Sequence, residues 1–171
     1  MSKVTDNYLK HTSGNPIQKI LIDRFFETLI REAKALNPQK VLDVGCGEGF
    51  TLEKLRGNNV GTYLEGMDFS ETALEIGRKI HPDLTFQHGD IYALPYKNDS
   101  FDLVVCSEVL EHLQKPQDAL KELIRVSNKY LLLTVPNEPF FTIGNFLRGK
   151  NLSRLGNDRE HIQHWSTSSF V

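Results

Sequence analysis

The sequence is poor in cysteine and has no excess of charge of either sign. Its 171 residues include two cysteines, Cys46 and Cys106, which do not form a spaced framework. A disulfide-rich secreted domain is therefore excluded, and we expect two free thiols in a reducing compartment. Lys and Arg total 20 against 22 Asp and Glu. This balance gives no basic surface for nucleic acid or for an anionic membrane.

Long apolar runs are also absent. No stretch approaches the roughly 20 apolar residues that a membrane-spanning helix needs. The first residues, MSKVTDNYLK, lack the apolar centre of a secretory signal. We therefore expect a soluble, cytoplasmic protein without a membrane span. The length suits one domain with a full core.

Helical and strand patterns alternate along most of the chain. Short apolar runs typical of buried strands lie at 40–45, 62–68, 84–90, 101–107 and 129–136. Helical patterns lie at 15–38, 48–56, 71–80 and 116–128. This alternation predicts an α/β fold, a doubly wound, Rossmann-like and mainly parallel sheet with helices on both faces.

Helix boundaries and buried faces follow from the same patterns. Asn15 can cap the first long helix, Pro16 suits its first position, and Ser70 can cap the helix at 71–80. Helical spacing of apolar residues predicts the following buried positions: Ile17, Ile20, Leu21, Phe25, Leu29, Ala73, Gly77, Ile80, Ala119, Leu120, Leu123 and Ile124.

Polar and glycine residues follow the ends of the predicted strands. The first strand runs into the stretch VLDVGCGEGF, residues 41–50, which contains three alternate glycines. Asp68 follows the second strand, Asp90 the third, and Ser107 and Glu108 the fourth. Because the carboxyl ends of parallel strands meet at one edge, we expect these residues to line a single crevice.

The charge of this crevice argues against a nucleotide pyrophosphate. Asp43 precedes the first glycine and Glu48 lies within the glycine loop, so both carboxylates would repel phosphate. The spacing is G-x-G-x-G rather than G-x-G-x-x-G, and no G-K-[ST] follows as in a P-loop. Carboxylates suit a ligand with a ribose, an amine and a positive centre. S-adenosylmethionine combines all three.

The successive motifs resemble a known family. VLDVGCGEG, GMDFS, HGDIYALPY, FDLVVCSEVLEHL and LLLTVPNEP, within about residues 40–140, are similar in order to the motifs of class I S-adenosylmethionine-dependent methyltransferases. The likeness is greatest to the small-molecule branch, methyltransferase type 11, that includes quinone-biosynthesis enzymes. It implies methyl transfer from S-adenosylmethionine to a small-molecule acceptor by direct in-line displacement, with S-adenosylhomocysteine as product.

The resemblance also implies a set of cofactor-binding residues: Asp43, Gly45, Cys46, Gly47, Gly49, Asp68, Phe69, Asp90, Ile91, Ser107 and Glu108. In this interpretation the glycines approach the methionine and ribose portions. Asp43 orients the loop and helps to hold the amino group, Asp68 accepts from the ribose hydroxyls, and Phe69 packs on the adenine.

The other end of the predicted crevice has two parts. Asp90 would accept from the adenine amine while Ile91 packs on the ring, and Ser107 with Glu108 would line the methyl-transfer end. Family members usually add two strands, in the order 3-2-1-4-5-7-6. We expect this chain to be a fragment that lacks that C-terminal hairpin, with the strand at 130–135 as an exposed edge open to self-association.

Histidines are the candidate general bases. His112 is the first candidate and His164, with His161 nearby, the second; a structural hydrogen bond is the alternative for His112. Glu108 and His112 are spaced to share a helical face, close to Glu111. Because a further ligand of clear spacing is lacking, we predict no metal site.

We treat residues 1–171 as one domain with three parts. Residues 1–38 form an N-terminal lid and helix, 39–136 the cofactor-binding core, and 137–171 a substrate lid. The following residues are lid candidates: Tyr8, Lys10 and His11, unless the terminus is disordered. Towards the C-terminus, Trp165 either closes a substrate lid or packs on the core. The same two alternatives hold for Phe140, Phe141 and Phe146.

Two other functions remain open from the sequence. The chain could hold S-adenosylmethionine without transferring its methyl group. It could also be a nicotinamide-dependent oxidoreductase, because a dinucleotide site would share the acid after the second strand.

Overall fold

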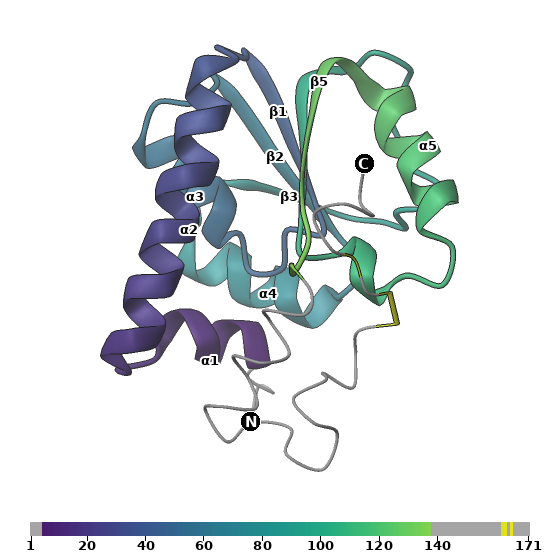
Figure 1. The fold of residues 1–171 in the computed structure, drawn as a ribbon. Helices are drawn as coiled ribbons and strands as arrows, with labels where there is room; N and C mark the ends of the chain where they lie inside the picture. The colour runs from purple at the N-terminus through teal and green to yellow at the C-terminus, as the bar shows by residue number, and fades with distance from the viewer. Residues whose placement is uncertain (1–4, 138–161, 164, 166–171) are drawn as a thin grey trace.

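The sheet is fully parallel in the part of the chain that the computed structural model describes, residues 5–137, 162, 163 and 165. Its strands are hydrogen-bonded in the order β3-β2-β1-β4-β5. Figure 1 shows this sheet between its helices. The strands are β1 Lys40–Val44, β2 Tyr63–Asp68, β3 Thr85–His88, β4 Phe101–Ser107 and β5 Ser127–Thr134. The order reverses between β1 and β4, so the predicted doubly wound α/β fold is confirmed.

Helices cover both faces of the sheet. The helices are α1 Asp6–Thr12, α2 Pro16–Ala35, α3 Phe50–Gly57, α4 Glu71–Ile80, the 3-10 helix η1 Leu110–His112 and α5 Pro116–Val126. Side chains of α2, α3 and α4 pack on one face and those of α5 on the other. None of the helices described is both long and apolar enough to cross a membrane.

The predicted helix starts are confirmed. Asn15 accepts hydrogen bonds from the backbone N–H groups of Ile17 and Gln18, at 3.0 and 3.2 Å, and Pro16 takes the first position of α2. Ser70 accepts from the N–H of Ala73 and caps α4. These side chains satisfy helix donors that have no partner within the helix.

The prediction for the buried face of α2 is mostly wrong, although Phe25 is half-buried. Leu29 is buried, but Ile17, Ile20 and Leu21 are 65%, 53% and 50% exposed. The first turns of α2 lie beside α1 rather than over the sheet (Figure 1), so periodicity there does not mark the core. Ile80 and Ile124, also predicted to be buried, are exposed as well. The buried residues of α2 are Phe26, Leu29 and Ala33.

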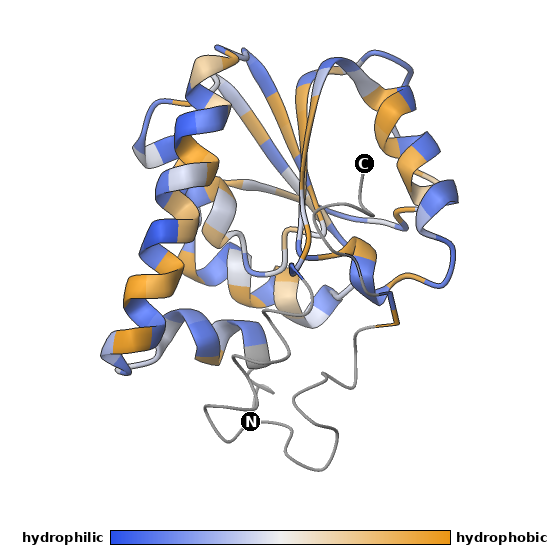
Figure 2. Cartoon of the chain, in the orientation of Figure 1, coloured by the Kyte–Doolittle hydropathy of each residue, from blue (hydrophilic) through white to orange (hydrophobic). Residues whose placement is uncertain are grey.

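The core lies between the sheet and its helices, and Figure 2 shows hydrophobic residues along the strands and in bands on α5. Cys46 and Cys106 are buried free thiols, as predicted, and burial raises the pKa of both. Trp165 packs against the cluster on the α5 face, so the core-packing alternative for this residue is the observed one. Phe140, Phe141 and Phe146 lie outside the described residues.

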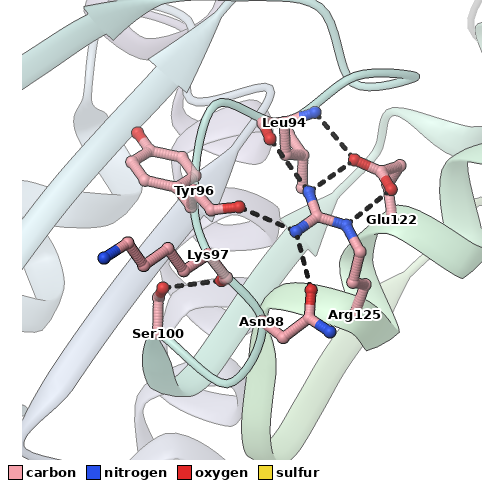
Figure 3. Close-up of polar contacts among 7 residues, drawn as sticks. All are labelled: Leu94, Tyr96, Lys97, Asn98, Ser100, Glu122 and Arg125. Carbon is pink, nitrogen blue, oxygen red and sulfur yellow. Dashed lines mark hydrogen bonds and ion pairs between the residues drawn. The ribbon is translucent and has the colours of Figure 1, made fainter.

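Arg125 of α5 fastens the loop between β3 and β4 (Figure 3). Its guanidinium donates to the carbonyls of Tyr96 and Leu94, at 2.7 and 2.9 Å, and to the Glu122 carboxylate. A further bond reaches Asn98, and Glu122 accepts from the N–H of Leu94. The helix therefore fixes the course of a loop that starts at the end of β3, where the predicted adenine contacts lie.

We expect Arg125→Ala to lower the free energy of unfolding by about 2–3 kcal/mol, because two carbonyls and a carboxylate lose a charged donor. Urea unfolding measures the change. Lys121→Ala is the matched control, since its ion pair with Asp118 is exposed on the same helix. An equal loss in the two variants would show that the Arg125 network contributes nothing beyond a surface ion pair.

Candidate functional site

A large cavity of about 1830 Å³ lies where the strands end. It sits at the reversal of strand order, where open α/β sheets bind their ligands. Ligand pockets usually measure about 300–1,000 Å³. This cavity therefore has room for a cofactor and a second molecule. Its wall includes the following residues from the predicted set: Gly45, Cys46, Gly47, Asp68, Phe69, Asp90, Ile91, Ser107, Glu108 and His112.

The glycine loop has a backbone that other residues rarely adopt. Gly45 and Gly47 have φ angles of 77° and 54°, in the left-handed region. A Cβ on Gly45 would lie 2.3 Å from Cγ2 of Val109, so a side chain there would displace the neighbouring segment. Gly49 is the N-cap residue of α3 and is not among the residues that line the cavity. The loop thus presents backbone rather than side chains to the cavity.

Asp68 joins the loop to the end of β2. Its Oδ2 accepts from the N–H of Gly47 and its Oδ1 from the N–H of Ser70, each at 2.7 Å. A carboxylate oxygen accepts more than one hydrogen bond, so Asp68 retains capacity for a ribose diol on the cavity side. Phe69 beside it is 77% exposed and lines the same wall, as an adenine-packing residue requires.

Asp90 and Ile91 line the cavity at the end of β3. The Asp90 carboxylate is exposed, and its Oδ1 accepts from the N–H of Tyr92 at 2.9 Å. This local bond orients the side chain without burying it. The carboxylate is therefore placed to accept from a ligand amine.

Asp43 lies behind the loop and not on the cavity wall. It is 1% exposed, and its Oδ2 has no hydrogen-bond partner among the described residues. Burial, with a smaller contribution from Asp68, raises the pKa of Asp43 to about 7. Its buried position next to the loop agrees with the predicted role of orienting the loop.

Glu48 has hydrogen-bond partners that the sequence did not predict. It is fully buried, and its two carboxylate oxygens accept hydrogen bonds from the hydroxyl of Thr5 and the side-chain amide of Asn7. Both carboxylate oxygens are therefore bonded to the N-terminal segment, while Glu48 also contributes to the cavity wall. The sequence shows an acid in a glycine loop but not which distant residues meet it.

The helix α1 packs over the glycine loop and α3. The His11 ring stacks on Phe50 with a centroid distance of 4.4 Å, and the Tyr8 ring lies 6.2 Å from the same ring. Burial, followed by the charge of Lys10, lowers the pKa of His11 to about 4. Lys10 and His11 line the cavity, so two of the predicted lid candidates contribute to its wall.

The prediction that Glu108 and His112 share one face of a helix is wrong. Glu108 has a φ of 56°, in the left-handed region, and the helical turn that follows is a short 3-10 segment. The hydroxyl of Thr134 donates to Glu108 at 3.2 Å and bonds with the Ser107 hydroxyl at 2.8 Å. A non-glycine residue held in this strained backbone region is a common feature of functional sites.

Glu111 belongs to the site, although the sequence placed it only next to Glu108 and His112 and not among the cofactor-binding residues. It is 1% exposed, lines the cavity, and has no hydrogen-bond partner for either carboxylate oxygen among the described residues. Burial, and to a lesser degree the charge of Glu108, raises the pKa of Glu111 to about 8. His112 Nε2 lies 4.0 Å from Glu111 Oε1. The sequence signal that could have indicated Glu111 as a site residue was its position between Glu108 and His112.

The predicted histidines further along the chain, His161 and His164, lie outside the described residues. Within the described residues, no group of three or more His, Cys, Asp and Glu side chains is arranged to hold a metal ion.

Comparison with known proteins agrees with these features. The profile of the family described as "Methyltransferase domain" matches residues 42–130. The demethylmenaquinone methyltransferase of Renibacterium salmoninarum is 33% identical over 138 residues, which make up 80% of this chain and 57% of that protein. The mitochondrial ubiquinone biosynthesis O-methyltransferase of Schizosaccharomyces pombe is 29% identical over 121 residues, 65% of this chain and 43% of that protein. The chain thus spans about half the length of these relatives.

A solved structure shows the same fold. The methyltransferase domain of bacterial CtHen1 is similar with a TM-score of 0.70 at 23% identity, covering 88% of this chain and 80% of that one. Likeness at this identity concerns the Rossmann-like fold alone. The two relatives are methyltransferases by their descriptions, so they give no support to the nicotinamide-dependent alternative.

We expect Glu111→Gln to flatten the pH dependence of stability. The folded-state pKa of about 8 exceeds the ordinary 4.5, so the folded state binds the proton more tightly. The neutral Glu111 carboxyl therefore makes its whole contribution to the free energy of unfolding below about pH 4.5. This contribution is lost as the pH rises through about 8. Because Gln does not ionise, the variant gains on the order of a few kcal/mol relative to wild type between these limits.

Urea unfolding at a series of pH values measures this effect. Glu75→Gln, on the exposed side of α4, is the matched control and should follow the wild-type curve. Parallel curves for wild type and Glu111→Gln would show that Glu111 titrates normally.

Proposed function

The chain belongs to the methyltransferase-domain family, among the class I S-adenosylmethionine-dependent methyltransferases, and from this membership we propose that it transfers a methyl group from S-adenosylmethionine to a small molecule. The observation that carries the proposal is the placement of Asp68 and Asp90 on one cavity wall. They follow neighbouring strands, beside a glycine loop that exposes its backbone.

The residues of the cavity fit this cofactor. Asp68 offers carboxylate oxygens to a ribose diol, Phe69 offers an exposed ring to adenine, and Asp90 offers an acceptor to the adenine amine. Gly45 and Gly47 line the cavity with backbone that the methionine portion can approach closely. At the far end, Glu108 places an acid where a positive sulfur would lie.

Methyl transfer from this cofactor requires mainly that the acceptor be held in the right position. When bound, S-adenosylmethionine supplies a methyl group on a positively charged sulfur, which keeps the electron pair of the broken carbon–sulfur bond. The chain's residues would hold the acceptor next to that methyl group, at the part of the cavity wall that includes Glu108 and Glu111. His112, which lines the transfer end, takes the proton of an acceptor hydroxyl or amine. His164 is the second candidate for this role.

The acceptor is proposed to be a small molecule with an apolar body. Part of the cavity wall is apolar and comes from α1 and α2, with these residues: Leu9, Leu21, Ile22, Phe25 and Phe26. The named relatives act in quinone biosynthesis or on demethylmenaquinone, according to their descriptions, which agrees with an apolar acceptor.

Further features of the proposal concern the whole chain. We propose that the protein is cytoplasmic. We also propose that it has no nucleic acid partner, in line with its net charge of −2. Residues 1–38 act as lid and first helix, 39–136 as cofactor core, and 137–171 as substrate lid. In the described sheet, β5 is an edge strand, and such an edge can pair with a second copy of the chain.

We expect Asp90→Asn to weaken binding of S-adenosylhomocysteine at least about tenfold, because an amide N–H₂ then opposes the adenine amine. The same variant should lose much less affinity for S-inosylhomocysteine, whose ring carries a carbonyl at that position. Isothermal calorimetry measures both. Asp83→Asn, exposed between α4 and β3, is the matched control. Absence of any S-adenosylhomocysteine binding by wild type would end the proposed function.

We expect His112→Ala to lower kcat about 10²- to 10⁴-fold for a hydroxyl acceptor, because the proton acceptor is removed. Mass spectrometry of methylated product from a panel of phenols and quinols measures turnover. Calorimetric affinity for S-adenosylhomocysteine should stay unchanged and serves as the control for folding. Unchanged turnover at every pH would remove His112 from the mechanism.

A further inference from the structure

Glu48 is buried among polar partners that come from far away in the sequence. Its carboxylate accepts from the Thr5 hydroxyl, 43 residues distant, and from the Asn7 amide. A buried carboxylate is costly unless hydrogen bonds compensate for lost water. Both donors belong to the N-terminal segment 5–12, which we call the strap. The strap therefore supplies what the carboxylate needs in order to be buried in the glycine loop.

The strap also needs these contacts in order to fold, just as Glu48 needs them in order to be buried. Its helix, α1, has 7 residues. Isolated helices shorter than about 12–15 residues are marginal in water, so α1 needs tertiary contacts. Thr5 also caps α1 by accepting from the N–H of Tyr8 at 3.1 Å. One hydroxyl thus begins the helix and joins it to the loop.

The strap runs along the cavity from the glycine loop to the transfer end. Thr5, Asn7 and Leu9 line the wall near its start, followed by Lys10 and His11. The charge of Lys10 acts on Glu108 and Glu111, lowering the pKa of each against the effect of burial. The Asn7 amide also lies 3.1 Å from where a Cβ on Gly47 would be, so the strap closes tightly on the loop.

We propose that Glu48 is a positioning residue that latches the strap across the cavity, so that cofactor binding and product release require its bonds to Thr5 and Asn7 to break. The proposal rests on the proposed function for the identity of the ligand. It differs from the sequence-based view of Glu48 as part of a cation-binding surface. The latch sets the rate of exchange and aligns Lys10 with the carboxylates of the transfer end.

Asn7→Asp tests the latch by placing a second carboxylate against Glu48. Amide exchange in residues 6–12, followed by mass spectrometry, should speed up at least about tenfold, as loss of a charged hydrogen bond predicts. The dissociation rate of S-adenosylhomocysteine, measured by stopped flow, should rise by a similar factor. Asn59→Asp, an exposed change in the turn before β2, is the matched control and should alter neither rate.

A second pair of variants guards against a general folding defect. Thr5→Val removes the hydroxyl but keeps the side-chain shape, and it should speed up both rates. Thr5→Ser keeps the hydroxyl and should restore wild-type rates. Thermal unfolding of each variant reports whether the sheet remains intact.

The outcomes separate the latch from the proposed function. Unchanged exchange in residues 6–12 of Asn7→Asp would overturn the latch, and so would faster exchange with an unchanged dissociation rate. If wild type binds no S-adenosylhomocysteine, the proposed function fails. The exchange measurement on the free protein still decides whether Glu48 holds the strap.

Discussion

The carbonyl of Met67 accepts hydrogen bonds from the backbone N–H groups of Gly45 and Cys46, at 2.7 and 3.1 Å. The position of the rest of the site depends on this contact. It holds the glycine loop against the end of β2. Asp68, the next residue, can then bind the loop at Gly47 while facing the cavity. The same placement presents Glu48 to the N-terminal segment. Sheet, loop and strap are therefore connected through one short stretch of backbone.

Much of the fold follows from local sequence signals. Apolar runs, caps such as Asn15 and Ser70, and the alternation of elements were sufficient to predict a parallel doubly wound sheet. Acids placed at strand ends predicted the cavity wall, because parallel strands bring their carboxyl ends to one edge. These signals depend on periodicity and on a topology that physical chemistry restricts.

The errors have a common physical origin in tertiary contacts. Ile17 and Ile20 have helical spacing, but the turns that carry them lie beside α1 instead of the sheet. The positive φ of Glu108 ends any regular helical face there, and no residue type at that position announces it. The partners of Glu48 are distant in sequence, so its environment depends on where α1 docks.

The register of the sheet has a consequence for folding speed. β1 pairs with β4 through contacts such as Val41 with Leu103, so the centre of the sheet joins segments far apart in the chain. Non-local parallel pairing closes a long loop before its contacts stabilise the structure, which slows folding. On the ribosome, β1 emerges well before its partner does. The reversal of strand order that creates the cavity therefore also delays the completion of the sheet.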